Sequence, residues 1–441
     1  MNPLAVELNE KIEQASPDVL ALLSERGRAL YWPKGILSQT AEARDKAHRF
    51  NATIGEATED GGPMALRSVL DQVPGLKPAD IVRYAPAPGK PELRQAWQKK
   101  LLDENPSMAS VRSGVPIVTH AITHGLALVG DLFVDPGDRL LLPDKFWGNY
   151  RLTYEVRLGA TIETYNTYTP DGGFDVPAMR EALLQGPDKT ILLLNFPNNP
   201  TGYMPTRAEV EAIRDAVVEA AEAGKRLLVV TDDAYYGLVY DDDALQESPF
   251  GLLAGLHPRV LSVKLDGATK ELFVWGLRCG FLTFGAPPVD GADAILEALE
   301  KKVMGAIRGG ISNCAQLSQS VVLNALQSPK IGDERREKLE ILKARALRVK
   351  QVAGDSKYTE SWDVYPFNAG YFMCIRLKRG VDAEALRLHL LDEYGVGLIS
   401  NGRTDLISNG RTDIRVAFSC LELDEIEPLF DCVHAAIGDL A

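Results

Sequence analysis

Polar side chains able to do chemistry follow three short apolar runs in the middle of the sequence. They lie in the segments Asn195–Gly202 (NFPNNPTG), Thr231–Gly237 (TDDAYYG) and Asp266–Glu271 (DGATKE), and Arg278 follows Lys270 by eight residues. Each segment alone is a weak signal, because acids and phenols often cap strands and a single lysine is usually solvated. Together they offer an amide, an acid, a phenol, an amine and a guanidinium.

One cofactor would use all of these groups. An amine binds an aldehyde, an acid pairs with a pyridine nitrogen, an amide and a phenol hold a phenolic oxygen, and an arginine binds a phosphate. Pyridoxal 5′-phosphate carries these four features. The sequence therefore predicts a pyridoxal-phosphate site in which Lys270 supplies the amine.

The elements that must position these residues are strands buried on both faces. Apolar runs that do not alternate with polar residues lie at 139–142, 190–194, 226–230, 260–263 and 281–284. Helical stretches such as Pro91–Glu104 and Thr206–Ala223 separate them. This order predicts an α/β fold whose large domain holds a mainly parallel sheet between helices. Ligands bind such sheets at the carboxyl ends of the strands.

The second half of the chain predicts a smaller domain. A charged helix over Gly332–Gly354, with Leu342, Leu347 and Val349 on its apolar stripe, is typical of a long connecting helix. Strand, helix, strand and helix patterns follow it, which indicates an α+β domain. We expect a helical N-terminal arm and part of the small domain over 1–63, a large domain over 64–325, and a small C-terminal domain over 326–441.

The octapeptide LISNGRTD occurs at 398–405 and again at 406–413. Two short copies do not make a repeat architecture. A local duplication that lengthens a surface loop between two strands explains them, and a sequencing artefact would give the same text.

Composition narrows the class of protein. The 441 residues include 48 Lys and Arg against 61 Asp and Glu, and the net charge of −13 argues against a general nucleic-acid binder. The five cysteines are not spaced in pairs, so we expect them to be small buried hydrophobic side chains of a protein in a reducing compartment. Six histidines without HExxH spacing predict no metal site. The sequence has no apolar run long enough to span a membrane and no signal-like start. We therefore expect a cytoplasmic protein that does not bind membranes.

From about Asn51 to the C-terminus, the chain resembles the fold-type I, class I/II pyridoxal-phosphate-dependent aminotransferases. The resemblance is carried by NNPTG, by the DxAY pattern at Asp232–Tyr235, and by the spacing of Lys270 and Arg278. The resemblance to a narrower group, the MocR-like or divergent aspartate aminotransferases, is less specific. The resemblance implies an aspartate aminotransferase-like fold and transfer of an amino group between an amino acid and a 2-oxo acid.

The resemblance also implies roles for residues around the cofactor ring. Lys270 matches the lysine that holds pyridoxal phosphate as an internal aldimine, and Asp232 matches the acid that pairs with the pyridine nitrogen, with Asp233 a minor alternative. Tyr235 and Asn199 match the donors to the phenolic oxygen. The lysine role requires a neutral amine and hence a lowered pKa.

A second set of residues matches the family's phosphate and ring contacts. Arg278 and Thr269 match phosphate ligands, and Gly267 stands where the family often has a further serine. In the strand–turn–helix segment 118–127, we assign Ile122 through its backbone and Thr123 through its hydroxyl, and we interpret His124 as a packed residue. Trp147, ahead of Phe146, matches the aromatic ring that stacks on the pyridine. The family's aspartate aminotransferases place a histidine three residues after that tryptophan, where this chain has Tyr150.

A third set concerns the substrate and assembly. Arg415 matches the small-domain arginine that binds the α-carboxylate, so Arg403 and Arg411 in the repeated octapeptide are expected to be loop residues. Gly55 resembles the turn that closes over the substrate, and Asn199 also lies on the substrate side. Tyr84 resembles a tyrosine that reaches the neighbouring subunit's phosphate, which implies a homodimer. Arg308 resembles an arginine that selects dicarboxylic amino acids, although a solvated residue at a helix end is an almost equal interpretation.

Two other functions use much of the same sequence. A lyase or decarboxylase of the same fold would share the lysine, acid, tyrosine and arginine, and only the two candidate carboxylate arginines favour transamination. A MocR-type DNA-binding regulator would need a winged helix, for which we expect no room in about fifty non-basic residues before the core.

Overall fold

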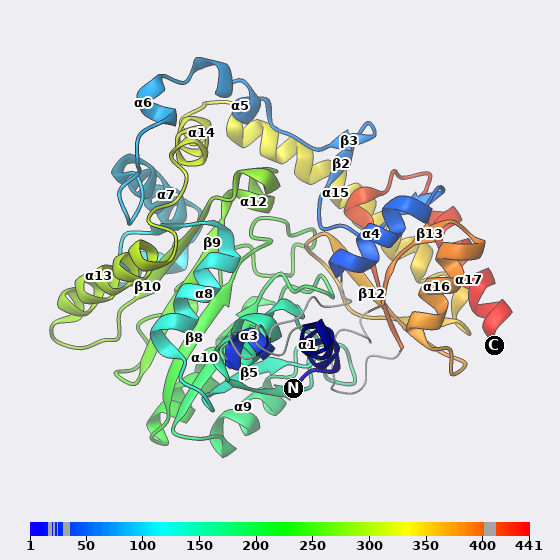
Figure 1. The fold of residues 1–441 in the computed structure, drawn as a ribbon, viewed down its shortest axis with the longest axis horizontal. Helices are drawn as coiled ribbons and strands as arrows, with labels where there is room; N and C mark the ends of the chain where they lie inside the picture. Colours follow the sequence, from blue (N-terminus) through cyan, green and yellow to red (C-terminus); the bar gives the residue numbers. More distant parts are fainter. Residues whose placement is uncertain (16–19, 21–22, 24, 30–35, 401–411) are drawn as a thin grey trace.

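The computed structural model describes residues 1–15, 20, 23, 25–29, 36–400 and 412–441. Figure 1 shows a larger lobe built around one sheet and a smaller lobe that contains the C-terminus. The long helix α15 (Ile331–Ala353) runs from one lobe to the other.

Seven strands form the sheet of the large lobe in the order β4-β10-β9-β8-β7-β5-β6. Their bounds are β4 (Ile117–Thr119), β5 (Arg139–Pro143), β6 (Thr161–Tyr165), β7 (Lys189–Asn195), β8 (Arg226–Asp232), β9 (Val260–Gly267) and β10 (Gly280–Gly285). The pairs from β6 through β9 are parallel, as predicted. β10 is antiparallel to both β9 and β4, which the apolar pattern alone did not indicate.

The central strands are buried on both faces because successive residues contribute to different cores. On β7, Ile191 and Leu193 pack into one apolar cluster, whereas Leu192 and Leu194 pack into another. α10 contributes Val210 and Val217 to the second cluster. The non-alternating runs in the sequence are explained by this arrangement.

Helices surround the sheet and build the N-terminal segment. They are α1 (Pro3–Ala15), α3 (Glu25–Ala29), α4 (Ile36–Lys46), α5 (Arg67–Leu70), α6 (Pro78–Ile81), α7 (Pro91–Glu104), α8 (Ala121–Phe133), α9 (Val176–Gln185), α10 (Arg207–Glu222), α11 (Phe250–Leu253), α12 (Ala268–Glu271), α13 (Ala292–Gly310) and α14 (Gln316–Leu326). A π-helix spans Arg151–Val156. α10 begins at a capping box in which Thr206 and Glu209 satisfy each other's backbone N–H groups.

The small lobe contains a four-stranded sheet in the order β11-β12-β15-β14. Its elements are β11 (Trp362–Val364), β12 (Phe372–Leu377), α16 (Ala383–Glu393), β14 (Ile399–Ser400), β15 (Asp413–Ala417) and α17 (Ile426–Leu440). β1 (Phe50–Asn51) pairs in parallel with β13 (Val396–Gly397), so the N-terminal segment joins this lobe. A hairpin of β2 (Thr58–Glu59) and β3 (Gly62–Pro63) follows β1. The exact domain boundaries remain predictions.

Three details refine the sequence-based expectations. The apolar stripe of α15 includes buried Leu342 and Val349, but Leu347 is 52% exposed, because position 347 does not fall on the same helical face. The repeated octapeptide contributes β14 from its first copy and Asp413 of β15 from its second, while residues 401–411, including Arg403 and Arg411, lie outside the described residues. The five cysteines form no disulfide among the described residues, and four of them are buried. Within the described ranges, no helix is long and apolar enough to cross a membrane.

Candidate active site

The carboxyl ends of β7 and β8 lie side by side and are tied together by Asn195. In the sheet register Asn195 pairs with Asp232. Its side-chain amide donates to the Asp232 carbonyl at 2.9 Å, and its amide oxygen accepts the backbone N–H of Asn199 at 2.8 Å. The sequence segments that carry Asn199 and Asp232 are therefore held at one edge of the sheet.

Asp232 is a buried carboxylate with a hydrogen-bond donor on each side-chain oxygen. Tyr150 donates its hydroxyl to Oδ2 at 2.7 Å, and the backbone N–H of Ala234 donates to Oδ1 at 3.1 Å. Burial raises the pKa of Asp232 to about 6, while the Tyr150 hydrogen bond and the charge of Lys270 act in the opposite direction. At neutral pH the group is thus mostly charged but close to its titration range.

Asp233 faces different partners from Asp232. Its Oδ2 accepts the Ser248 hydroxyl at 2.5 Å and forms an ion pair with buried Lys264. The structure therefore separates two adjacent acids that the sequence offered as alternatives.

Lys270 lies on α12, one turn beyond the end of β9. Its Nζ is 4.9 Å from the centre of the Tyr235 ring, and no carboxylate among the described residues forms an ion pair with it. Burial lowers its pKa to about 8, with Arg278 acting in the same direction and Asp232 opposing. Tyr371 donates its hydroxyl to the Lys270 carbonyl at 3.2 Å, so a small-lobe residue helps to place the lysine.

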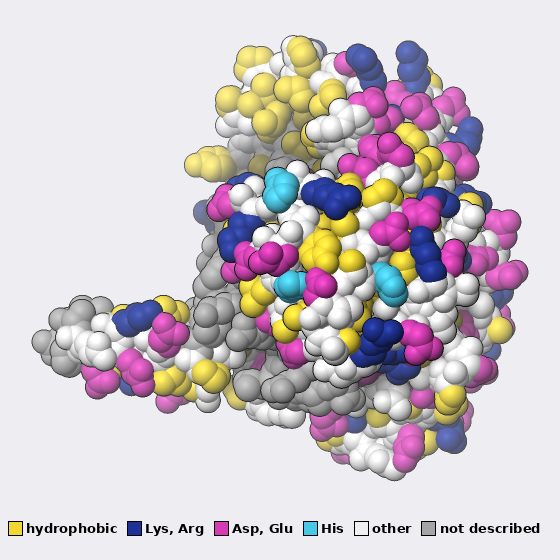
Figure 2. Space-filling view, turned by 90° about the vertical axis from the view of Figure 1, so that its right-hand side faces the viewer, with side chains coloured by type: hydrophobic (Ala, Val, Ile, Leu, Met, Phe, Trp, Pro, Cys, Tyr) yellow, Lys and Arg dark blue, Asp and Glu magenta, His cyan; other side chains and the backbone are white. Residues whose placement is uncertain are grey.

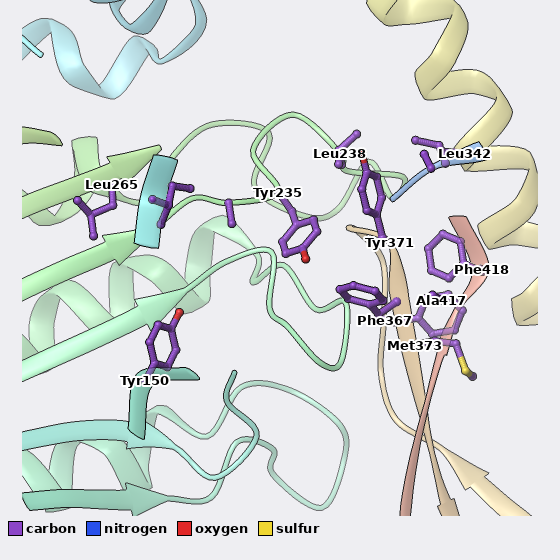
Figure 3. Close-up of a cluster of buried hydrophobic side chains, with 14 of the residues drawn as sticks. Tyr150, Tyr235, Leu238, Leu265, Leu342, Phe367, Tyr371, Met373, Ala417 and Phe418 are labelled. Carbon is purple, nitrogen blue, oxygen red and sulfur yellow. The ribbon is translucent and has the colours of Figure 1, made fainter. Parts of the chain in front are cut away.

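Tyr235 lies between the two lobes. Its ring contacts Tyr371 and Phe372 edge-on at 5.4 and 5.6 Å. Figure 3 shows Tyr235 between the large-lobe strand that carries Leu265 and the small-lobe residues Tyr371, Phe367 and Phe418. Burial raises the pKa of its hydroxyl, whereas the charge of Arg415 and a hydrogen bond with Asn199 oppose that shift.

Arg415 is a buried guanidinium that lacks a carboxylate partner among the described residues. It donates from Nη1 to the Asn199 side-chain oxygen at 3.2 Å and from Nη2 to the Thr53 carbonyl at 2.8 Å, and its centre lies 4.0 Å from the Phe372 ring centre. Its Nε is buried without a hydrogen-bond partner among those residues. Such a group can bind an anion strongly.

Gly55 lies beside the same contacts. A Cβ there would come within 3.0 Å of Phe372 and 3.7 Å of the Tyr235 hydroxyl. The turn that contains Gly55 therefore lies against the two aromatic residues near Arg415. Its place on the substrate side stays a prediction.

Three segments meet where the phosphate contacts were predicted. Gly280 of β10 approaches the start of α8 so closely that a Cβ would lie 2.7 Å from the Ala121 carbonyl carbon, and β9 runs beside it with Gly267 opposite Gly280. Thr269 follows Gly267 by two residues, and its buried hydroxyl has no hydrogen-bond partner among the described residues. Arg278 begins the approach to β10 in a left-handed conformation (φ 50°).

His120, the N-cap residue of α8, makes no side-chain capping hydrogen bond to the first turn of the helix in the described part of the chain. Ile122 is buried and Thr123 is exposed. Phosphate binding by the Ile122 backbone and the Thr123 hydroxyl stays a prediction. His124 accepts the backbone N–H of His120 at 3.0 Å, and burial lowers its pKa to about 4. It is thus a neutral residue that stabilises the turn.

The aromatic loop after β5 is anchored next to Asp232. Trp147 packs edge-on against Tyr150 with ring centres 5.5 Å apart. The Lys145 carbonyl accepts the Asn198 amide at 3.1 Å, while the Arg151 guanidinium covers Phe146 at 5.3 Å. Trp147 is therefore the aromatic residue that directly contacts the partner of Asp232.

Two predicted residues lie on the surface, away from these contacts. Tyr84 is 90% exposed, and Arg308 is an exposed residue that donates to Ser312 at 2.6 Å. Figure 2 shows hydrophobic side chains gathered at the top of the molecule, the level of α5 and α6 in Figure 1. The exposed apolar residues of that region are Leu70, Val73, Ile81, Val82 and Tyr84.

Sequence reasoning assigned no role to four residues that build the site. Asn195 ties two strand ends, Thr53 and Phe372 hold Arg415, and Tyr371 holds the lysine carbonyl. Only Asn195 had a local signal, since it opens the NFPNNPTG segment. The others come from distant parts of the chain.

The described residues fit pyridoxal phosphate. The orphaned Thr269 hydroxyl, the uncapped N–H groups of α8 and half-buried Arg278 can hold a phosphate, and Asp232 and Lys270 lie at neighbouring strand ends. Burial leaves Lys270 with a pKa of about 8, which suits an amine that must lose its proton to bind an aldehyde.

Comparisons with known proteins show which family and which fold this chain is similar to. The family model described as aminotransferase class I and II matches residues 50–433. A probable aspartate/prephenate aminotransferase of Aquifex aeolicus is 26% identical over 57% of this chain, and a probable N-succinyldiaminopimelate aminotransferase of Mycobacterium tuberculosis is 28% identical over 60%. The matches span 58% and 63% of those relatives' lengths. The crystal structure of an aminotransferase from Anaerococcus prevotii superposes with a TM-score of 0.81 at 22% identity, covering 95% of this chain and 99% of that one.

Proposed function

The chain belongs to the class I and II aminotransferase family, and from this we propose that it moves an amino group between a dicarboxylic amino acid, such as aspartate or glutamate, and a 2-oxo acid, with pyridoxal phosphate as cofactor. The observation that carries the proposal is Arg415, a buried guanidinium without a carboxylate partner among the described residues, placed against Asn199 beside Tyr235 and Lys270. A substrate α-carboxylate would satisfy it.

The residues of the large lobe would hold the cofactor. Thr269, Arg278, the Ile122 backbone and the Thr123 hydroxyl would bind its phosphate, Trp147 would cover its ring, and Asn199 with Tyr235 would donate to its phenolic oxygen. When bound, pyridoxal phosphate supplies an aldehyde that condenses with amines and a ring that accepts the electron pair left when Cα loses its proton.

Proton transfers would be carried out by two groups. Lys270 would bind the aldehyde carbon and, once the substrate amine has displaced it, would carry the proton from the substrate Cα as a neutral base. Asp232, kept charged by the Tyr150 hydrogen bond, would hold a proton on the pyridine nitrogen. The first 2-oxo acid would leave before the second enters, which makes the kinetics ping-pong.

Selection of a dicarboxylic substrate is assigned to Arg308 of a second subunit. Arg308 forms no ion pair with a described carboxylate, and the exposed apolar residues near Tyr84 fit a surface that a second copy of the chain covers. We therefore propose a homodimer with shared sites. The narrower MocR-like placement and a cytoplasmic location remain predictions.

A spectrophotometric half-reaction screen tests the function. Purified protein loaded with pyridoxal phosphate is mixed with single amino acids, and the visible absorbance of the bound cofactor should disappear fastest with aspartate or glutamate and return when 2-oxoglutarate is added. Pyruvate and ammonia released without any 2-oxo acid acceptor would instead indicate a lyase. Binding of pyridoxal phosphate without amino-group transfer to any substrate would contradict the proposal.

A further inference from the structure

A cluster of buried charged groups lies next to the candidate site and has no part in the function proposed above. Lys264 of β9 is fully buried between Asp233 and Asp266, with its Nζ 3.3 Å from Asp266 Oδ2 and in closer contact with Asp233. Trp97 donates its indole N–H to Asp266 at 3.0 Å, and Ser248 donates to Asp233. We call these three charged residues, Lys264, Asp233 and Asp266, the rear cluster.

The rear cluster carries more negative than positive charge. Two carboxylates share one ammonium group, and the second oxygens of both, Asp233 Oδ1 and Asp266 Oδ1, are buried without a hydrogen-bond partner among the described residues. Burial opposes the charge on Lys264, but the two carboxylates outweigh burial and raise its pKa. The two carboxylates thus favour the charged form of Lys264, and its loss would leave them uncompensated.

The rear cluster adjoins the carboxylate that faces the site. Asp233 follows Asp232 directly, and Lys264 pairs in the sheet with Thr231, the residue before Asp232. After burial, the negative charge of Asp233 is a further cause that raises the pKa of Asp232. All of these groups are buried, and charges in a dry interior interact more strongly than charges in water because little water screens them.

We propose that Lys264 is a positioning residue that keeps Asp232 ionised against the ring nitrogen of the cofactor by offsetting the charges of Asp233 and Asp266. This inference rests on the proposed function, since it concerns the same acid. The other titratable groups near Asp232 are Tyr150, Tyr154, Tyr235 and Lys270, and all of them stay unchanged in the test below.

The test compares two ligands that differ in one ring atom. Apoenzyme is titrated with pyridoxal phosphate and with its 1-deaza analogue, in which carbon replaces the ring nitrogen, and the ratio of the two dissociation constants is measured by fluorescence. Only the nitrogen-containing ligand gains from a charged Asp232. The ratio therefore reports the charge of Asp232, whereas a general loss of folding weakens both ligands alike.

Three variants should change the ratio of the two dissociation constants, one in one direction and two in the other. Lys264→Met should reduce the preference for pyridoxal phosphate by about fivefold, on the scale expected for one buried charge near another. Asp233→Asn removes a negative charge next to Asp232 and should increase the preference. Asp266→Asn should increase it by less, because it removes a charge that is not adjacent in the chain.

The outcomes separate the two proposals. Wild-type protein that fails to bind pyridoxal phosphate would contradict the proposed function itself. Wild-type protein that prefers pyridoxal phosphate, together with an unchanged ratio in Lys264→Met, would overturn only the role of Lys264. If Lys264→Met does not fold, the two asparagine variants decide: a ratio that rises in neither of them overturns the inference.

Discussion

The cations on the two sides of Asp232 differ in their partners. On the site side, Lys270, Arg278 and Arg415 form no ion pair with any carboxylate in the described part of the chain. In the rear cluster, Lys264 is held by two carboxylates. The pKa of Lys270 is lowered to about 8 mainly by burial, whereas that of Lys264 is raised.

The difference shows how one fold region uses positive charge in two ways. A cation with carboxylate partners is satisfied within the protein and contributes to the internal charge balance. A half-buried or buried guanidinium without a carboxylate partner is desolvated and can bind an anionic ligand, whereas a buried amine whose pKa is lowered can lose its proton and bind an electrophilic carbon. Site-side cations should therefore control ligand and reaction, and rear cations should act only indirectly.

The largest expected effect comes from Lys270. Lys270→Ala removes the amine that we propose binds the aldehyde and carries the proton, so kcat should fall by at least about 1,000-fold in the amino-transfer assay. Lys301→Ala, which removes an exposed lysine of α13 paired only with Glu297, is the control and should keep wild-type activity. Retained transamination in Lys270→Ala would contradict the inference that the cations on the site side of Asp232 control the reaction.

An intermediate effect is expected from Arg415 and Arg308, the two arginines proposed to bind the substrate carboxylates. Arg415→Ala should lower kcat/KM about 100-fold for aspartate and alanine alike, because every amino acid carries the α-carboxylate and a charge-assisted pair contributes about 1.5–3 kcal/mol.

Arg308→Ala should lower kcat/KM for aspartate about tenfold more than for alanine. An equal decrease of kcat/KM for both substrates in Arg308→Ala would contradict the proposed role of Arg308 in substrate selection.

The smallest effect concerns Tyr150. Tyr150→Phe removes the hydrogen bond that favours the charged form of Asp232, so the pKa of Asp232 should rise above its value of about 6. Because activity requires the charged form, the acidic limb of the kcat/KM profile should move about 0.5–1 pH unit upward. Tyr154→Phe is a matched control, since that buried hydroxyl has no hydrogen-bond partner among the described residues. A shift of equal size in Tyr154→Phe would assign the effect to packing.

Much of the site could be predicted because its residues follow strand ends that the apolar runs reveal. Asn199, Asp232 and Lys270 lie within a few residues of β7, β8 and β9, so local sequence places them at one edge of the sheet. The residue types then limit the chemistry.

Contacts between distant segments could not be predicted in this way. Tyr150 meets Asp232 across 82 residues of sequence, and Arg415 meets the Thr53 carbonyl across 362. The antiparallel direction of β10 likewise depends on its neighbours β4 and β9, since its own residues are apolar in either direction. Such features follow from tertiary packing rather than from propensity.

The pairing of β14 with β15 bears on how the chain has changed in length. Ile399 and Ser400 come from the first copy of the octapeptide and Asp413 from the second, and Ile399 pairs with Arg415. Deleting either copy leaves the same sequence, in which LIS and the final Asp still flank a single connection. A chain with one copy would therefore keep Ile399, Ser400, Asp413 and Arg415, so the duplication changes the number of residues between β14 and β15 and leaves these strand residues the same.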